Sequence, residues 1–175
     1  MLLLYTIFSL YDSSYMNSFH LNPYSFLLFI HMKLLTHLNA FIIATSVTLF
    51  IATFVLKIPH LISNQPELVN LYYVKNFHKN VPLDFLLIFV YLYIPLYVAS
   101  FFKIKTKVST ISMIVLCTTL LTGGFCYYSR SFPMTSSFFS KWFHKAGYSV
   151  IVYDIILLVC TYLIYDYLLT MTKHS

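Results

Sequence analysis

Apolar residues gather in long blocks along this chain, and charged residues mark where the blocks end. Four blocks are long enough to cross a bilayer, which takes about 20 mostly apolar residues. They cover residues 38–56, 83–102, 108–128 and 148–169. Phe and Tyr collect near the block ends, as is typical of the aromatic belts at a membrane surface. The pattern predicts an all-α, multi-pass membrane protein with four transmembrane helices.

The first 31 residues follow a different pattern. Residues 1–10 and 24–30 are apolar but too short to span a bilayer, and the first lysine is Lys33. The segment therefore lacks the basic start of a secretory signal. We interpret residues 1–31 as an upstream extension of the reading frame or as a peripheral segment on the bilayer. Residues 32–175 then form the membrane domain.

The composition excludes the soluble and disordered classes. Hydrophobic residues make up 59% of the chain and charged residues 9%, against about 25% charged in soluble domains. A soluble domain of this size leaves too much surface exposed to hide so many apolar side chains, and disorder requires high charge. The net charge of +6 comes from basic residues between the apolar blocks. We therefore expect the lipid bilayer, and not nucleic acid, to be their partner.

Loop charges give a prediction for the orientation in the membrane. Four spans place both termini on one side, and the Lys and Arg counts on the two sides nearly tie. The densest basic cluster is the short turn at residues 103–107. Because basic loops favour the cytoplasm, we predict that this turn and both termini are cytoplasmic.

Residues 135–147 predict a short interfacial amphipathic helix. Ser and Thr at residues 135–137 can cap its start, and Gly147 suits its end. Aromatic residues between them fall on one helical face and basic residues on the others. The rings would lie in the acyl boundary with the bases toward phosphates, or would dock another protein with Trp142 as anchor. The expected contact residues are Phe138, Phe139, Lys141, Trp142, Phe143, His144 and Lys145.

The long connection at residues 57–82 predicts a second surface helix. Pro66 and Glu67 are residue types that favour a helix start. The apolar face of this helix would consist of Leu68, Leu71, Tyr72 and Phe77.

Small residues recur at every fourth position of the first block and would line one face of its helix. In lipid, close backbone approach at small residues drives helix association. This stripe is the expected packing face, toward another span or toward a second copy in a homo-oligomer. In the second block, Pro95 predicts a kink. The stripe consists of Ala40, Ala44, Thr48 and Ala52.

The fourth block contains an acidic residue, Asp154, about a turn and a half from its start. Ionisable residues within spans are costly and are functional candidates by default. One interpretation is an anchor or interhelix hydrogen bond near the headgroups, with His144, Lys145, Tyr148 or Tyr153 as partner. The other is an ion or proton site of a small channel or transporter.

Catalytic and metal-binding patterns are absent from the sequence. The seven histidines are scattered, and neither a Gly-rich phosphate loop, a nucleophile elbow nor an acidic pair occurs. We therefore expect no metal and no cofactor, and a membrane enzyme assembled from distant residues is the third alternative for function. The cysteines have no metal-ligand spacing, and we interpret them as small buried hydrophobes. They are Cys117, Cys126 and Cys160.

Several segments of the C-terminal half form a familiar pattern, namely Val81–Phe85, Gly123–Tyr127, Phe138–His144, Gly147–Tyr148 and Tyr153–Asp154. With these segments, the C-terminal half resembles a family of small uncharacterised membrane proteins of large nucleocytoplasmic DNA viruses of algae and protists. The resemblance covers roughly residues 80–170. It implies a viral setting, in the inner membrane of a virion or in a remodelled host membrane, and no activity. The expected function is to anchor or organise capsid or other membrane proteins of the virion, with a small ion channel or transporter as the alternative.

Overall fold

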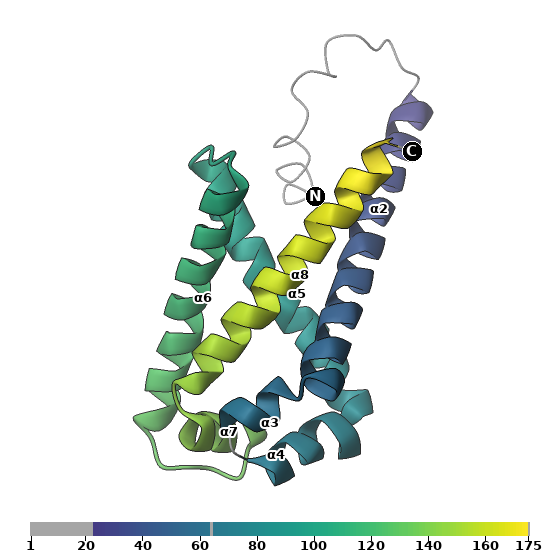
Figure 1. Ribbon diagram of the computed structural model, residues 1–175. Coiled ribbons are helices and arrows are strands. Elements are labelled where there is room, and N and C mark those ends of the chain that lie inside the picture. Colours follow the sequence, from purple (N-terminus) through teal and green to yellow (C-terminus); the bar gives the residue numbers. More distant parts are fainter. Residues whose placement is uncertain (1–22, 64, 175) are drawn as a thin grey trace.

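The computed structural model describes residues 23–63 and 65–174, and the described part is helical throughout its length apart from short connections, with no strand. Each predicted span lies in a helix long and apolar enough to cross a membrane. The prediction of an all-α protein with four transmembrane helices is confirmed (Figure 1). These helices are α2 (Pro23–Phe50) with its π-helical continuation η1 (Ile51–Val55), α5 (Phe77–Phe101), α6 (Lys107–Arg130) and α8 (Ser149–His174).

The first helix begins well before the predicted start of its span. α2 starts at Pro23, a residue type that favours the first turn of a helix. The apolar run at residues 24–30 is therefore the beginning of α2 and is continuous with the first span. Residues 1–22, the rest of the predicted N-terminal segment, lie outside the described residues.

Three short helical segments gather at one end of the four spans, seen at the bottom of Figure 1. The predicted helix at residues 138–146 is present, and the Ser137 hydroxyl accepts a hydrogen bond from the Ser140 amide at its start. The other predicted surface helix begins at Pro66 and turns into a π-helix after five residues. The segments are α3 (Ile58–Ser63), α4 (Pro66–Asn70) with η2 (Leu71–Lys75), and α7 (Phe138–Ala146).

Only half of the apolar face predicted for residues 66–77 is turned inward. Leu68 and Tyr72 are buried, whereas Leu71 and Phe77 are exposed. The prediction assumed the regular α-helical period, and η2 departs from it because each of its turns takes in an additional residue. The π-helical stretch therefore changes which side chains point into the fold.

α8 is the central helix of the bundle, because it packs against α2 on one side and against α6 on the other. α5 packs mainly on α6. Pro95 lies buried inside α5, which continues without a break to Phe101. The predicted small-residue stripe is covered within the chain, because each of its four residues is at most 5% exposed. These residues are Ala40, Ala44, Thr48 and Ala52.

Polar contacts tie the far end of α8 to its neighbours. Lys107 Nζ lies 2.8 Å from a carboxylate oxygen of Asp166. His37 Nδ1 and the Tyr165 hydroxyl are 2.7 Å apart and share a hydrogen bond. At the other end, the Ser149 hydroxyl donates to the Ile62 carbonyl oxygen at 3.1 Å. α8 is thereby connected to α2, α3 and α6.

The cysteines do not share one environment. Cys126 is fully buried, as predicted, and Cys117 is half-buried, but the prediction of burial is wrong for Cys160, which is exposed on α8. The outer surface of a membrane helix faces lipid tails, so an apolar side chain gains little by turning inward.

The connection between α7 and α8 yields a prediction about backbone strain. Gly147 has φ +61° and ψ −142°, and a Cβ there would lie 2.8 Å from Arg130 Nη1. We expect Gly147→Ala to lower the free energy of unfolding by about 1–3 kcal/mol, because non-glycine residues are strained in this region. Thermal unfolding of the purified protein in detergent measures the effect. The control is Gly124→Ala, where a Cβ meets no atom within 4 Å, and equal destabilisation by both changes would contradict the assignment.

Candidate functional site

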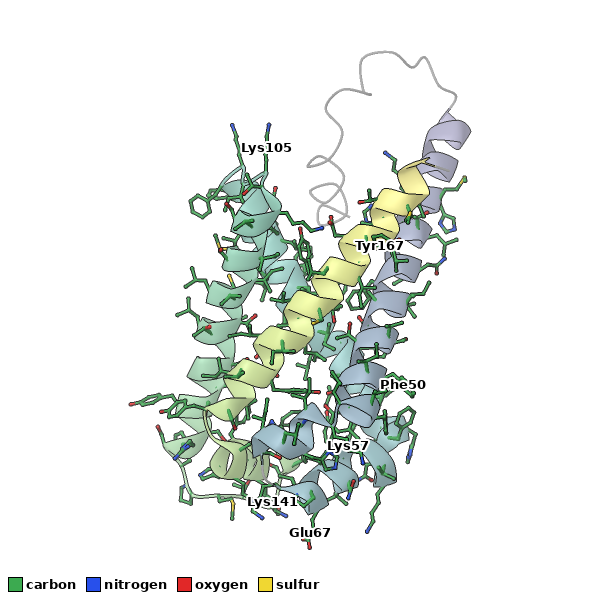
Figure 2. All side chains as sticks on the ribbon, viewed as in Figure 1. Phe50, Lys57, Glu67, Lys105, Lys141 and Tyr167 are labelled. Carbon is green, nitrogen blue, oxygen red and sulfur yellow. The ribbon has the colours of Figure 1, made fainter. Side chains whose placement is uncertain are left out.

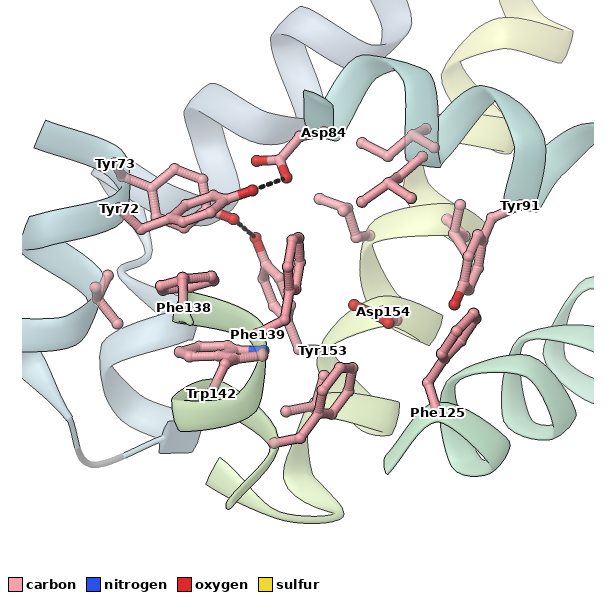
Figure 3. A pocket seen from close by; sticks show the side chains of 17 residues that line it. Tyr72, Tyr73, Asp84, Tyr91, Phe125, Phe138, Phe139, Trp142, Tyr153 and Asp154 are labelled. Carbon is pink, nitrogen blue, oxygen red and sulfur yellow. Dashed lines mark hydrogen bonds between the residues drawn. The ribbon is translucent and has the colours of Figure 1, made fainter. Parts of the chain in front are cut away.

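A cavity of about 380 Å³ lies between the spans at the end where the short helices gather (Figure 3). Its wall comes from α4, η2, α5, α6, α7 and α8. Two carboxylates, Asp84 of α5 and Asp154 of α8, are on this wall. Most of the remaining surface is aromatic, from Tyr72, Tyr73, Tyr91, Phe125, Phe138, Phe139, Trp142, Phe143 and Tyr153.

Asp154, the acidic residue found in the sequence, lies about 8 Å along α8 from Ser149. Thr122 of α6 donates a hydrogen bond to Asp154 Oδ2 at 2.7 Å. Of the partners predicted from the sequence, His144 is engaged elsewhere, because its ring nitrogens face the carbonyl oxygens of Ser140 and Phe132, at 2.8 and 3.0 Å. Asp154 therefore links two spans through a hydroxyl group that sequence reasoning did not identify.

Asp84 was overlooked because the predicted second span began at residue 83, which made Asp84 a boundary residue. α5 instead begins at Phe77, so Asp84 lies about 10 Å into the helix. The Tyr72 hydroxyl donates a hydrogen bond to Asp84 Oδ1 at 2.6 Å. The other oxygen, Oδ2, is buried and accepts no hydrogen bond from the described residues. The available signal was an aspartate flanked by apolar residues on both sides.

Two neighbouring tyrosines of η2 supply hydroxyl groups to the cavity. Tyr72 reaches Asp84, and the Tyr73 hydroxyl lies 3.2 Å from the Tyr153 hydroxyl of α8. Burial, reinforced by the charge of Asp84, raises the pKa of Tyr72 far above its ordinary value. Burial is also the largest cause that raises the pKa of Tyr73, and the electrostatic effect of Tyr153 is the second. Both phenols therefore stay protonated. Tyr72 donates to Asp84, whereas either hydroxyl of the pair Tyr73 and Tyr153 can be the donor.

The aromatic face of α7 closes the cavity from the outer end of the bundle. Trp142 is only 9% exposed, and its ring is stacked on Phe138 at 5.8 Å between centroids. Phe138 in turn stacks on Tyr72 at 4.1 Å. Trp142 thus packs inside the fold. The predicted contact surface is divided. Phe139 and Phe143 are on the cavity wall, whereas Lys141 lies at the outer end of the bundle (Figure 2) and Lys145 is exposed.

The cavity has the chemistry of a cation site. In the described part of the chain no Lys, Arg or His lines it, so the two carboxylates have hydroxyl partners but no counter-charge. Aromatic ring faces also attract cations. The described residues contain no group of three His, Cys, Asp or Glu side chains that would hold a metal ion. Because the remaining wall is apolar, the arrangement favours an organic cation.

No family model, no curated protein and no solved structure matches this chain. The functional interpretation therefore rests on the chemistry of the cavity and on its place between membrane-spanning helices.

The hydrogen bond between Tyr72 and Asp84 generates a prediction about stability. We expect Tyr72→Phe to lower the free energy of unfolding by about 1–3 kcal/mol, because neither oxygen of the buried Asp84 carboxylate would then accept a hydrogen bond. Thermal unfolding in detergent measures this loss. Tyr97→Phe is the matched control, since Tyr97 is 45% exposed on α5, and its change should stay within about 0.5 kcal/mol. Equal losses in the two variants would show that the bond to Asp84 is unimportant.

Proposed function

We propose that this integral membrane protein is a small transporter that binds a lipophilic organic cation between its spans. The observation that carries the proposal is the pair Asp84 and Asp154, which come from different spans and share one aromatic cavity without a basic residue among its described lining. This develops the interpretation of Asp154 as the polar site of a channel or transporter, with a second carboxylate added.

The energetics of buried carboxylates support a charged ligand. An ionised carboxylate in an apolar interior is costly unless it is paired, and hydrogen bonds from neutral hydroxyl groups compensate only part of that cost. A cation bound in the cavity would supply the missing charge to both carboxylates. Asp84 Oδ2, which accepts no hydrogen bond from the described residues, is the position with the most to gain.

The size and lining of the cavity support an organic ligand. A volume of about 380 Å³ falls within the range of small-molecule pockets, roughly 300–1,000 Å³. Aromatic rings such as Trp142, Phe125 and Phe139 can contact both the charge and the apolar groups of such a cation. The membrane setting supports a lipophilic one, because it would partition into the bilayer beside the site.

Binding and uptake of tetraphenylphosphonium, a lipophilic organic cation, test the proposal on the full chain. We expect saturable binding to the detergent-purified protein and uptake into liposomes that contain it. Asp154→Asn and Asp84→Asn keep the side-chain shape but remove the charge, and each should weaken binding by at least about tenfold. Asp166→Asn, on the same helix but paired with Lys107 outside the cavity, is the control and should bind like the unaltered protein.

The outcomes separate binding from transport. Absence of binding, or equal loss in the Asp154 and Asp166 variants, would contradict the cation site. Binding without uptake would leave a membrane receptor for the cation and would contradict transport.

A second candidate function is structural, and the outward basic side of α7 favours it. Lys145 is exposed and Lys141 lies at the outer end of the bundle (Figure 2), where both can reach another protein or lipid phosphates. Together with the resemblance of the C-terminal half, this supports a protein of a viral inner membrane or remodelled host membrane that anchors capsid or other membrane proteins. In this arrangement we propose that both termini face the cytoplasm.

Particle proteomics tests the structural candidate. We expect the protein to remain in purified virions until detergent strips the membrane, and lysine crosslinking to join Lys141 or Lys145 to a capsid protein. Lys105, at the opposite end of the bundle in Figure 2, is the internal control and should give no such crosslink. Absence of the protein from intact particles would exclude this role.

A further inference from the structure

A second cavity, of about 420 Å³, lies where the first span ends. Its wall comes from η1, α3, α4 and η2 together with the connection after η1. Tyr73 lines both this cavity and the carboxylate cavity. The two cavities differ in charge, because the described lining of this one contains Lys57 and His60 and no acidic residue.

Lys57 provides the fixed positive charge of this cavity. It directly follows η1 and the capping residue Leu56, at the membrane boundary of the first span. Its backbone has φ +51°, a conformation that bulky residues rarely adopt and that Gly or Asn adopt more easily. A lysine held there places an ammonium group beside the cavity in spite of the conformational cost.

Two buried polar atoms on the cavity wall have no hydrogen-bond partner among the described residues. One is Thr53 Oγ1, in a side chain that is only 2% exposed, and the other is His60 Nδ1. His60 Nε2 lies 3.2 Å from the amide oxygen of Asn70 and donates to it. Lys57 and Thr53 can thus present an ammonium group and a hydroxyl group to one acceptor-rich group beside the His60 ring.

The rim of the cavity is apolar. Leu61 is 77% exposed, and Phe54 and Val74 are also exposed. A free inorganic anion has no apolar part that could contact such a rim, whereas the acyl chains of a lipid would lie along it. Because the first span ends at Val55, the cavity lies at the depth where lipid phosphates meet protein.

We propose that this cavity binds the phosphate headgroup of an anionic phospholipid. Lys57 neutralises the phosphate charge, the Thr53 hydroxyl donates a hydrogen bond to one of its oxygens beside the His60 ring, and Phe54, Leu61 and Val74 contact the acyl chains. This proposal does not rest on the organic cation proposed for the carboxylate cavity, and either proposal can fail while the other holds.

Native mass spectrometry of the full chain in detergent micelles tests this site. The probes are phosphatidylglycerol and phosphatidylcholine with identical acyl chains, and inorganic phosphate as a competitor. We expect phosphatidylglycerol to bind at least about tenfold more tightly than phosphatidylcholine, and millimolar phosphate not to displace it. Lys57→Gln and Thr53→Val should each weaken phosphatidylglycerol binding by at least about tenfold, and Lys57→Arg should restore it. Lys105→Gln, at the other end of the bundle, is the control and should leave binding unchanged.

Three results would overturn the proposal. Equal binding of the two lipids would show that the headgroup charge is not recognised. Displacement of the lipid by phosphate would identify a site for the free anion. Equal effects of Lys57→Gln and Lys105→Gln would show that the lipid follows net charge alone. Because Thr53 is buried, the binding result for Thr53→Val is used only if the variant unfolds at the same temperature as the unaltered protein. If it does not, the variants of the exposed Lys57 decide the test.

Discussion

A carboxylate inside an apolar membrane domain needs hydrogen bonds or a counter-charge, and this constraint organises the end of the bundle where the short helices gather. Asp154 of α8 is held by Thr122 of α6 at 2.7 Å, which fixes the two helices in register. Asp84 of α5 is held by Tyr72 at 2.6 Å, which brings η2 over the ends of the spans. The helices that make these two contacts are also the walls of the cavity.

The two π-helical segments contribute to the walls of the cavities. η2 lines both cavities, and η1 lines the cavity at Lys57. η1 carries Thr53, and η2 carries Tyr72 and Tyr73. Wide turns of this kind occur frequently at functional sites, because they turn side chains away from the regular helical faces. In η2 the result is that two consecutive tyrosines are both buried, and each reaches a different partner.

The two cavities are neighbours with opposite chemistry. The carboxylate cavity is acidic and aromatic, and the cavity at Lys57 is basic with an apolar rim. Tyr73 lines both, and its hydroxyl bonds to Tyr153 on the carboxylate side. A change at either site that moves the Tyr73 ring would therefore alter the wall of the other cavity. A lipophilic cation and an anionic lipid are suited to this pair of surfaces at the membrane boundary.

The sequence by itself determined the four spans, a short helix within residues 135–147 with a Ser or Thr cap and Gly147 at its end, and Asp154 as an acidic residue within a span. Only the tertiary structure decided that Asp84 shares a cavity with Asp154, that Tyr72 and Thr122 are their partners, and that Trp142 points inward. The reason is physical. Membrane helices are apolar on every side, so no polar face indicates which residues turn inward, whereas their lengths and ends are set by the bilayer. Contacts between helices distant in sequence then decide which polar groups meet.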